Sequence, residues 1–502
     1  MAGVYQWLTL ASGVQQLLAR LADPNGIFWN TTECELYIFR ALQMQNVLCN
    51  TWKTDFTYNP TQLWNSLGSL TGSPRLRTAT DAASYTMLQY YLLEPPTGAG
   101  TWTGTNQFSL SDLQNALQIR RDEMIQVSAC GDALLQNIPL TPNTRRTYLS
   151  DQILDVPRVR YLALQTSPTA TGSSGASSIT VSSSSGIAAG LLVSGTGIAP
   201  WATVSSVSGT TVTLSLPNTG AVSGVINFYL PNTLYRDDTV ALEWYESPLY
   251  QLPSGTPQTF QLSSEPPLSF DVDITPNQPG VYEAVTLQSG PVFAPPAATL
   301  LGIPNDFAYL LEYGALSDLF SRDAEASDHQ RAEYFAKRYL DGLQVMINTP
   351  WVMLANVDGV ACSVDPLAAV DRYYCDWDSN PTNFGPLVVT AGMDFIAAPV
   401  GHSVGITCLG NAPLLDAVTS SYLQVSRDAW EQVLNEAQFL ASVKMGGADF
   451  MAATELEKEF ILFCSGENSR LKSTGAFGDV LAQRAQGQDR NQERYSTNKN
   501  KQ

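Results

Sequence analysis

Residues 190–215 read GLLVSGTGIAPWATVSSVSGTTVTLS, and they lie within a longer stretch, 168–228, that is rich in Ser, Thr, Gly and Val. The apolar residues of this stretch alternate with polar ones, as at Val212, Leu214 and Leu216. Alternation with a period of two is typical of a strand that buries one face. We therefore predict a compact β-module here. The alternative, a disordered Ser/Gly linker, would lack this order.

Strand patterns continue on both sides of the stretch. Apolar and other residues alternate in 156–162 (VPRVRYL), before the module. The apolar runs that indicate strands after it lie at 258–262, 268–272 and 281–287. Pro- and Gly-containing turns separate these runs. We therefore predict one β-rich, sandwich-like domain, residues 147–167 plus 229–300, that is interrupted by the inserted all-β module at 168–228.

Helical patterns dominate the regions before and after this β-rich part. The helices predicted from apolar spacings of three and four lie at 31–49, 81–94, 110–128, 304–348 (an αα-hairpin) and 426–463, the last with a break at Gly446-Gly447. Thr31 or Thr32 is expected to cap the first of them. Ser109 is expected to cap the third, with Asp112 at the favourable end of the helix dipole. A further strand is expected at 403–409.

The sequence therefore predicts an α+β multidomain protein. In chain order its parts are a mainly helical N-terminal region (1–146), the β-rich domain (147–167 plus 229–300), the inserted uncharged module (168–228), a helical hairpin with a C-terminal α/β region (301–479), and a basic extended tail (480–502). The tail has almost no apolar residues, so it cannot build a core alone. Its positive charge could order it against the acidic surface of a neighbouring subunit.

The charge of the chain argues against several classes of partner. Lys and Arg number 27 and Asp and Glu 46, which gives a formal net charge of −19 over 502 residues. Binding to phosphate backbones or to anionic lipid needs clustered basic residues, so we expect neither specific nucleic-acid binding nor membrane attachment. No run of 18 apolar residues predicts a membrane span, and the start lacks the positive segment of a signal peptide.

The seven cysteines do not form a recognisable framework. They are Cys34, Cys49, Cys130, Cys362, Cys375, Cys408 and Cys464. Their number is odd, their spacing is wide and no C-x-x-C pair occurs, so we expect reduced thiols that are mostly buried. That composition suits folding in a cytoplasm.

One short motif resembles a catalytic signature. Residues 401–405 (GHSVG) fit the pattern G-x-S-x-G, in which Ser403 would be the nucleophile of an α/β-hydrolase. That fold needs a strand-to-helix turn at the serine and a histidine later in the chain. The residues after Ser403 predict a strand instead, and the chain has no histidine after His402. We therefore expect no nucleophilic catalysis here.

Acidic residues form two further candidate sites. Asp376, Asp378 and Asn380 resemble the start of a calcium loop, but proline occupies the required glycine position, so a solvated acidic turn is favoured over a metal site. Asp271 and Asp273 lie near aromatic residues, as glycosidase carboxylates do. Their alternation with apolar neighbours instead indicates the polar face of a strand.

The same consideration applies to a second carboxylate pair, Glu243 and Glu246, next to Trp244 and Tyr245. With only two histidines in the chain, the usual acid–base and metal chemistry has few residues to use. We expect no catalytic residue, no metal site and no cofactor.

Three other stretches resemble virion structural proteins of tailed bacteriophages, of the neck, adaptor or tail-ring type. They are residues 92–124 (LLEPPTGAGTWTGTNQFSLSDLQNALQIRRDEM), residues 264–291 (SEPPLSFDVDITPNQPGVYEAVTLQSGP), and the hairpin region from 301–307 (LGIPNDF) through 315–319 (ALSDL) to 331–334 (RAEY). The resemblance covers about residues 5–165 and 234–480. The segment 190–215 is similar to a small β-module of phage tail and surface proteins.

This resemblance implies a non-enzymatic structural subunit in the virion neck or tail, assembled in the host cytoplasm. Connector rings of this kind commonly hold six or twelve copies around the DNA path, next to portal, adaptor or tail proteins. DNA would then be passing cargo, which an acidic inner wall repels. The alternative is a receptor- or carbohydrate-binding tail component that acts through the inserted module. Trp201 could stack on a sugar, although a tryptophan that caps the core of the module is favoured.

Overall fold

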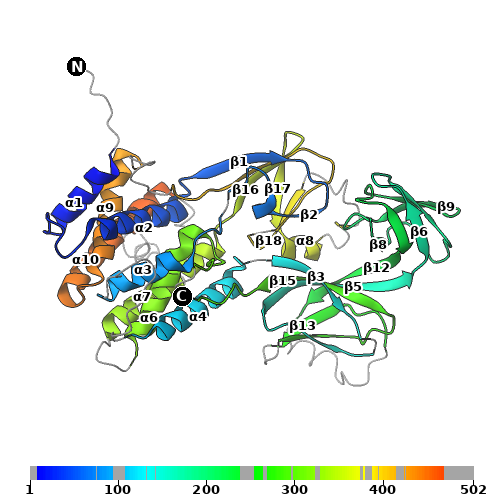
Figure 1. The fold of residues 1–502 in the computed structure, drawn as a ribbon, viewed down its shortest axis with the longest axis horizontal. Coiled ribbons are helices and arrows are strands. Elements are labelled where there is room, and N and C mark those ends of the chain that lie inside the picture. The colour runs from blue at the N-terminus through cyan, green and yellow to red at the C-terminus, as the bar shows by residue number, and fades with distance from the viewer. Residues whose placement is uncertain are drawn as a thin grey trace, which may run out of the picture.

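The computed structural model describes residues 8–74, 76–93, 108–131, 133–141, 143–237, 254–263, 268–294, 298–322, 328–373, 377–378, 387–393, 395–413, 423 and 425–468. It confirms the predicted α+β class. The helices form one lobe at one end of an elongated molecule, and three sheets occupy the rest (Figure 1).

The helical lobe is assembled from four separate parts of the chain. Its helices are α1 (Leu10–Arg20), α2 (Thr31–Cys49), α3 (Asp81–Tyr91), α4 (Leu110–Ser128), α6 (Ala308–Phe320), α7 (His329–Ile347), α9 (Arg427–Ser442) and α10 (Gly447–Glu467). Helix α2 packs against α9 and α10, while α6 packs against α3, α4 and α7. Helix α6 is buried over almost its whole length, so it forms the centre of the lobe.

Side-chain caps set the start of several helices. The expected caps Thr31 and Thr32 are wrong, because Asn30 is the N-cap of α2 and its side chain accepts the backbone N–H of Glu33. Asn30 lies one residue outside the helix, where its side-chain oxygen can reach that donor. The cap of α4 is confirmed, since Ser109 and Asp112 form a reciprocal capping box.

A seven-stranded sheet lies next to the helical lobe. Its order is β1-β20-β16-β17-β18-β19-β2. The strands are β1 (Lys53–Tyr58), β2 (Trp64–Ser66), β16 (Val352–Val357), β17 (Val360–Pro366), β18 (Leu387–Ala391), β19 (Phe395–Ala397) and β20 (Val404–Leu409), and the short helix α8 (Leu367–Tyr373) follows β17. Strands β1 and β2 belong to the region 1–146, predicted to be mainly helical, yet they form both edges of this sheet.

The β-rich domain is an eight-stranded sheet that folds over itself as a sandwich. Its strands are β3 (Ala133–Pro139), β4 (Arg146–Tyr148), β5 (Ile153–Thr166), β12 (Asn227–Arg236), β13 (Thr259–Ser263), β14 (Ser269–Val272) and β15 (Gly280–Gln288), with β8 (Leu192–Ser194) paired to β12. The ring of Phe270 on β14 packs against that of Tyr282 on β15, with centroids 5.0 Å apart. Strands β13, β14 and β15 confirm the strands expected at 258–262, 268–272 and 281–287.

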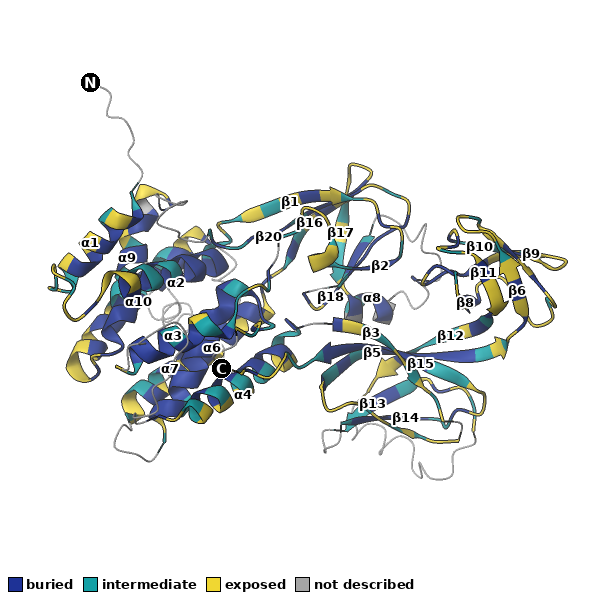
Figure 2. Ribbon diagram, in the orientation of Figure 1, coloured by how far each residue is buried: buried dark blue, intermediate teal, exposed yellow. Residues whose placement is uncertain are grey.

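Most of the inserted stretch forms a sheet of its own, although its strand β8 pairs with β12 of the sandwich. The order of this sheet is β11-β6-β7-β10-β9. The strands are β6 (Thr169–Gly172), β7 (Ser178–Val181), β9 (Val204–Ser208), β10 (Thr211–Leu214) and β11 (Val222–Val225). Val212, Leu214 and Leu216 are all buried, as their alternation predicted. The outer strands of this module carry many exposed residues at the end of the molecule far from the helices (Figure 2).

None of the helices in the described ranges combines the length and apolar character that crossing a membrane requires.

Candidate functional site: buried arginine joints

The G-x-S-x-G motif forms a turn that leads into strand β20. The Asp358 carboxylate accepts the backbone N–H of Ser403 (2.9 Å) and lies 2.7 Å from Nδ1 of His402. His402 and Asp358 are both substantially exposed. The His402 hydrogen bond and the Ser403 amide lower the pKa of Asp358. Asp358 itself lies in the tight turn between β16 and β17, so these bonds tie two turns together.

The carboxylates Asp271 and Asp273 belong to strand β14 and its end. Phe270 and Val272 are fully buried, which confirms the predicted alternation. The opposite face is also covered, because Arg146 on β4 forms two hydrogen bonds of 2.8 Å with the Asp271 carboxylate. Asp273 accepts the backbone N–H of Gln258. Both carboxylates therefore bind their own sheet.

The prediction of a solvated acidic turn is wrong for Asp378. Its side chain is 5% exposed and lies between two arginines of β5. Asp376 and Asn380 lie outside the described residues, as do Glu243, Glu246, the aromatic residues between them, and the tail 480–502. Asp378 instead points to the feature that the sequence reasoning missed, a set of buried arginines at the boundaries between lobes.

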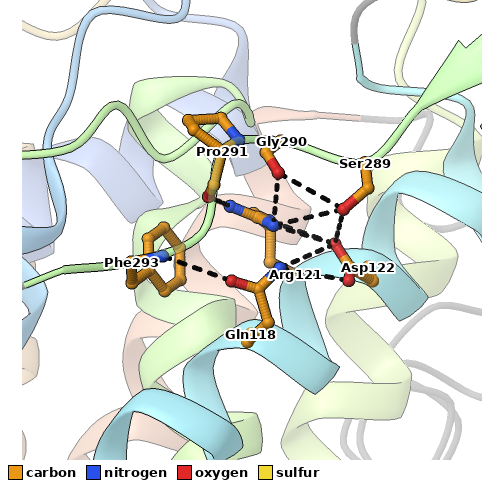
Figure 3. Close-up of polar contacts among 7 residues, drawn as sticks. All are labelled: Gln118, Arg121, Asp122, Ser289, Gly290, Pro291 and Phe293. Carbon is orange, nitrogen blue, oxygen red and sulfur yellow. Dashed lines mark hydrogen bonds and ion pairs between the residues drawn. The ribbon is translucent and has the colours of Figure 1, made fainter. Parts of the chain in front are cut away.

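The first boundary joins α4 to the segment that follows β15. Arg121, which is fully buried, donates to the backbone oxygens of Pro291 (2.5 Å) and Gly290 (2.9 Å). Its guanidinium also donates to Asp122, which accepts the Ser289 hydroxyl (3.0 Å). We call this cluster the α4 joint; Figure 3 shows the guanidinium enclosed by these groups.

The α4 joint depends on a close approach of backbone to guanidinium. A Cβ added at Gly290 would lie 2.8 Å from Nη1 of Arg121 and 3.0 Å from its Cζ. The ring of Phe293 covers the guanidinium on another side, 4.5 Å from Cζ to the ring centroid. Gln118, one turn earlier on α4, accepts the backbone N–H of Phe293. The joint therefore holds the chain where it leaves the sheet for the helical lobe.

The second boundary is made by the outward face of strand β5. Alternate residues of this strand, among them Val159 and Tyr161, fill the sandwich core. The residues between them include Arg158 and Arg160, so these point to the opposite face. There both guanidiniums are buried, although among the described residues the sheet contributes a single carboxylate partner, Glu283 on β15, which binds Arg160.

The remaining partners come from the seven-stranded unit. Arg158 contacts Asp371 on α8 and Asp378, each at 2.9 Å. Arg160 contacts Asp378 at 2.6 Å and Glu283 at 2.7 Å. We call these five residues the sheet joint. Two guanidiniums thus meet three carboxylates, and the Asp378 carboxylate bridges both arginines.

Aromatic rings close the sheet joint on two sides. The guanidinium of Arg158 lies over the ring of Trp377, whose Nε1 donates to Asp371 at 2.7 Å. The guanidinium of Arg160 lies over the ring of Trp201, 5.2 Å from Cζ to the centroid. Trp201 belongs to the inserted module. The joint therefore links the module, the sandwich and the seven-stranded unit.

Trp201 is 8% exposed, so the structure does not present it as a free stacking platform. Its backbone φ is +67°, which is uncommon for an aromatic residue. Trp201 packs in a core, which is the role that the sequence favoured over sugar binding. Its contact with Arg160 was not predicted. A cavity of about 280 Å³ lies beside it, between module and sandwich, and its lining includes Trp201, Tyr229 and Glu283.

The ionisation of the sheet joint follows from its geometry. Burial raises the pKa of Asp378, but Arg160 and Arg158 more than offset this effect, so that its pKa lies below the ordinary value. Burial raises the pKa of Glu283, and Arg160 only partly offsets the shift. Removing one member of such a buried set leaves the others without a partner, which typically costs about 3–5 kcal/mol. These residues can fix the angle between lobes.

The helical lobe contains buried ion pairs of the same kind. They are Arg40–Glu312, Arg338–Glu457 and Lys444–Glu33, all with side chains no more than 5% exposed. The first two pairs join helices from different parts of the chain, and the third joins α2 to the turn between α9 and α10. Among the described residues, no group of three His, Cys, Asp or Glu side chains has the arrangement of a metal site.

Two sequence signals point toward these joints in retrospect. Arg158 and Arg160 recur at a spacing of two within an apolar strand, which places both on one face. Arg121 follows Arg120 on α4, and the helical periodicity turns only Arg121 toward the core. No protein-family profile matches the chain, and no curated protein matches it either.

Proposed function

We propose that the chain is a non-enzymatic structural subunit of a tailed-phage virion, in a ring of six or twelve copies at the head–tail connector, neck or tail. Its partners would be further copies of itself and portal, adaptor or tail proteins. The sequence resemblance described above motivates this proposal. DNA passes through such a ring as cargo, and a net charge of −19 opposes its retention.

The sheet joint is the observation that carries the proposal. A ring subunit must present its contact surfaces at a fixed mutual angle, because small angular errors accumulate around a closed ring. Arg158 and Arg160 bind carboxylates of a separate unit at 2.6–2.9 Å, inside a buried site. The α4 joint holds the helical lobe to the same sandwich. Such joints favour a subunit of fixed shape.

Native mass spectrometry of the purified full-length chain, with negative-stain imaging, tests the proposal. We expect closed rings of six or twelve copies. The variant Asp378→Asn removes the bridging charge of the sheet joint and should reduce ring formation. The variant Asp365→Asn changes a carboxylate on β17 outside the joint, so it should assemble like the wild type. A chain that stays monomeric at every concentration would contradict the proposal.

A second candidate function is receptor or carbohydrate binding through the inserted module. The cavity of about 280 Å³ between module and sandwich favours it, since Trp201 and Tyr229 supply aromatic surface and Glu283 a carboxylate. Screening the purified chain against a glycan array tests this candidate. Binding that the variant Tyr229→Ala abolishes would support it. A distal position in the particle would favour it over the ring.

A further inference from the structure

Two cysteines from opposite ends of the chain meet where helices α2 and α10 end. Cys49 is the last residue of α2, and Cys464 lies in the last turn of α10, 415 residues later. The Cys49 thiol lies 4.0 Å from the backbone oxygen of Cys464. Cys464 is fully buried, whereas Cys49 is half-buried. Both are free thiols in this structure.

The Cys49 thiol is directed toward residue 464, because it donates to the backbone oxygen of Cys464. The two cysteines lie at the ends of helices that pack against each other, α2 and α10. Burial raises the pKa of Cys464 well above the usual range of a thiol. Cys49 is half-buried and Cys464 is fully buried, so an oxidant reaches Cys49 first.

Neighbouring hydrogen bonds hold the two helix ends in register. The Asn468 side chain donates to the backbone oxygen of Leu48 at 2.6 Å. The backbone N–H of Asn468 donates to the oxygen of Cys464 at 2.8 Å. Leu48 directly precedes Cys49. Asn468 therefore binds to both helix ends, which keeps the two cysteines close together without a covalent bond.

We propose that Cys49 and Cys464 are a latent disulfide that closes when the folded protein meets a small-molecule disulfide such as oxidised glutathione. The Cys49 thiolate attacks one sulfur of the small disulfide, which forms a mixed disulfide and releases one small thiol. The Cys464 thiol then loses its proton and attacks the Cys49 sulfur, which releases the second small thiol. Two protein thiols are oxidised by two electrons, and one small disulfide is reduced to two thiols.

The bond would staple the first part of the helical lobe to the last. A disulfide stabilises mainly by restricting the unfolded chain, and the effect grows with the length of the closed loop. The loop that this bond would close spans 415 residues. The inference concerns these two thiols alone and does not depend on the proposed function.

The test treats the native full-length chain with oxidised glutathione and maps disulfides by mass spectrometry of a non-reducing digest. We expect one dominant cross-linked peptide pair, Cys49–Cys464, that a reducing thiol reverses. The melting temperature should rise by several degrees on oxidation. The variants Cys49→Ser and Cys464→Ser should each lose both effects. The variant Cys362→Ser, which removes another half-buried thiol, should keep both.

Two results would overturn the inference. In the first, Cys49 stays as a glutathione adduct on the folded chain while Cys464 remains a free thiol. In the second, the cross-link forms only after the chain has been unfolded with urea. If Cys464→Ser fails to fold, Cys49→Ser decides alone, since Cys49 is half-buried at a helix end; circular dichroism checks its fold.

Discussion

At the level of single residues, the molecule tolerates buried guanidiniums because backbone and carboxylate oxygens surround them. Arg121 donates to two backbone oxygens of the segment after β15 as well as to Asp122, so its joint needs backbone close to the guanidinium. Arg158 and Arg160 are bound by carboxylates from other elements. Burying a charge is costly unless such partners are present. The two joints therefore depend on different residues and can be tested separately.

The α4 joint predicts the effect of one added methyl group. In Gly290→Ala the new Cβ would lie 2.8 Å from the Arg121 guanidinium, which is enclosed and cannot move away freely. We expect a loss of about 1–3 kcal/mol in the free energy of unfolding, measured by urea denaturation. Gly466→Ala is the control, because nothing lies near its Cβ position in α10. It should be neutral or slightly stabilising. Equal stability of the two variants would contradict this account of the joint.

A second residue, Glu436 on α9, predicts the pH dependence of stability. It is fully buried, and neither carboxylate oxygen has a hydrogen-bond partner among the described residues. Burial raises its pKa to about 8 from an ordinary value of 4.5, although Arg338 acts in the opposite direction. The folded protein therefore keeps a proton that the unfolded chain loses. Stability from this group is complete below the unfolded value and is lost as the pH rises through the folded one.

The variant Glu436→Gln should therefore flatten the decline in stability between about pH 4.5 and 8. The expected difference in the free energy of unfolding across that range is on the order of a few kcal/mol, measured by denaturation at each pH. Glu457, whose pKa burial also raises, should leave a residual slope. Glu431→Gln, an exposed position on the same helix, is the control. The prediction fails if Glu436→Gln and Glu431→Gln have the same slope.

At the level of elements, sequence patterns predicted the features that depend only on residues within one helix or strand. Helix α4 was predicted with its Ser109 cap, and strand β15 with nearly its full extent, because cap chemistry and apolar periodicity are contained within each element. Strands β1 and β2 were not predicted. They are short and obtain their partners from β20 and β19, near the other end of the chain. No pattern within β1 or β2 alone predicts this pairing.

Strand β5 shows the same limit for the candidate site. A strand places Arg158 and Arg160 on one face, but an arginine face normally lies in solvent. Only the arrival of Asp371 and Asp378 from α8 and the residues after it makes that face a buried joint. The expectation that Asp378 lies in a solvated turn failed for this reason. Which face is buried is a tertiary property that the strand alone does not contain.

The inserted module is expected to be dispensable for the rest of the fold. Tyr229 on β12 pairs with Leu164 on β5, so the strand ends on either side of the replaced residues lie side by side. We expect that replacing 168–228 with a short Gly/Ser linker leaves a soluble, folded chain, measured by circular dichroism and size-exclusion chromatography. Some stability should be lost, because Trp201 no longer covers Arg160.

The matched control for this replacement is Trp201→Ala, which keeps the module but removes the same ring. The two variants should lose similar amounts of stability in thermal unfolding. Aggregation of the replaced chain would show that the module is part of the host core.

At the level of the whole molecule, four separate chain segments form one helical lobe. The α4 joint attaches this lobe to the sandwich, and the sheet joint attaches the sandwich to the seven-stranded unit and the inserted module. Acidic residues outnumber basic ones throughout the second half before the tail, so the chain carries a net charge of −19. The sequence predicted this charge directly, because net charge needs no fold. It could not predict the arrangement of the lobes, which depends on contacts between residues hundreds of positions apart.

The most direct test of the proposed function is to image virus particles that contain this chain with a gold label attached to the inserted module. A ring subunit predicts label at a fixed height around the particle axis, at the neck or along the tail. It also predicts six or twelve copies for each particle. Label confined to the tip of a distal fibre or spike would contradict the ring and favour receptor binding. Particles that lack the label while the labelled chain remains in the lysate would contradict a virion role altogether.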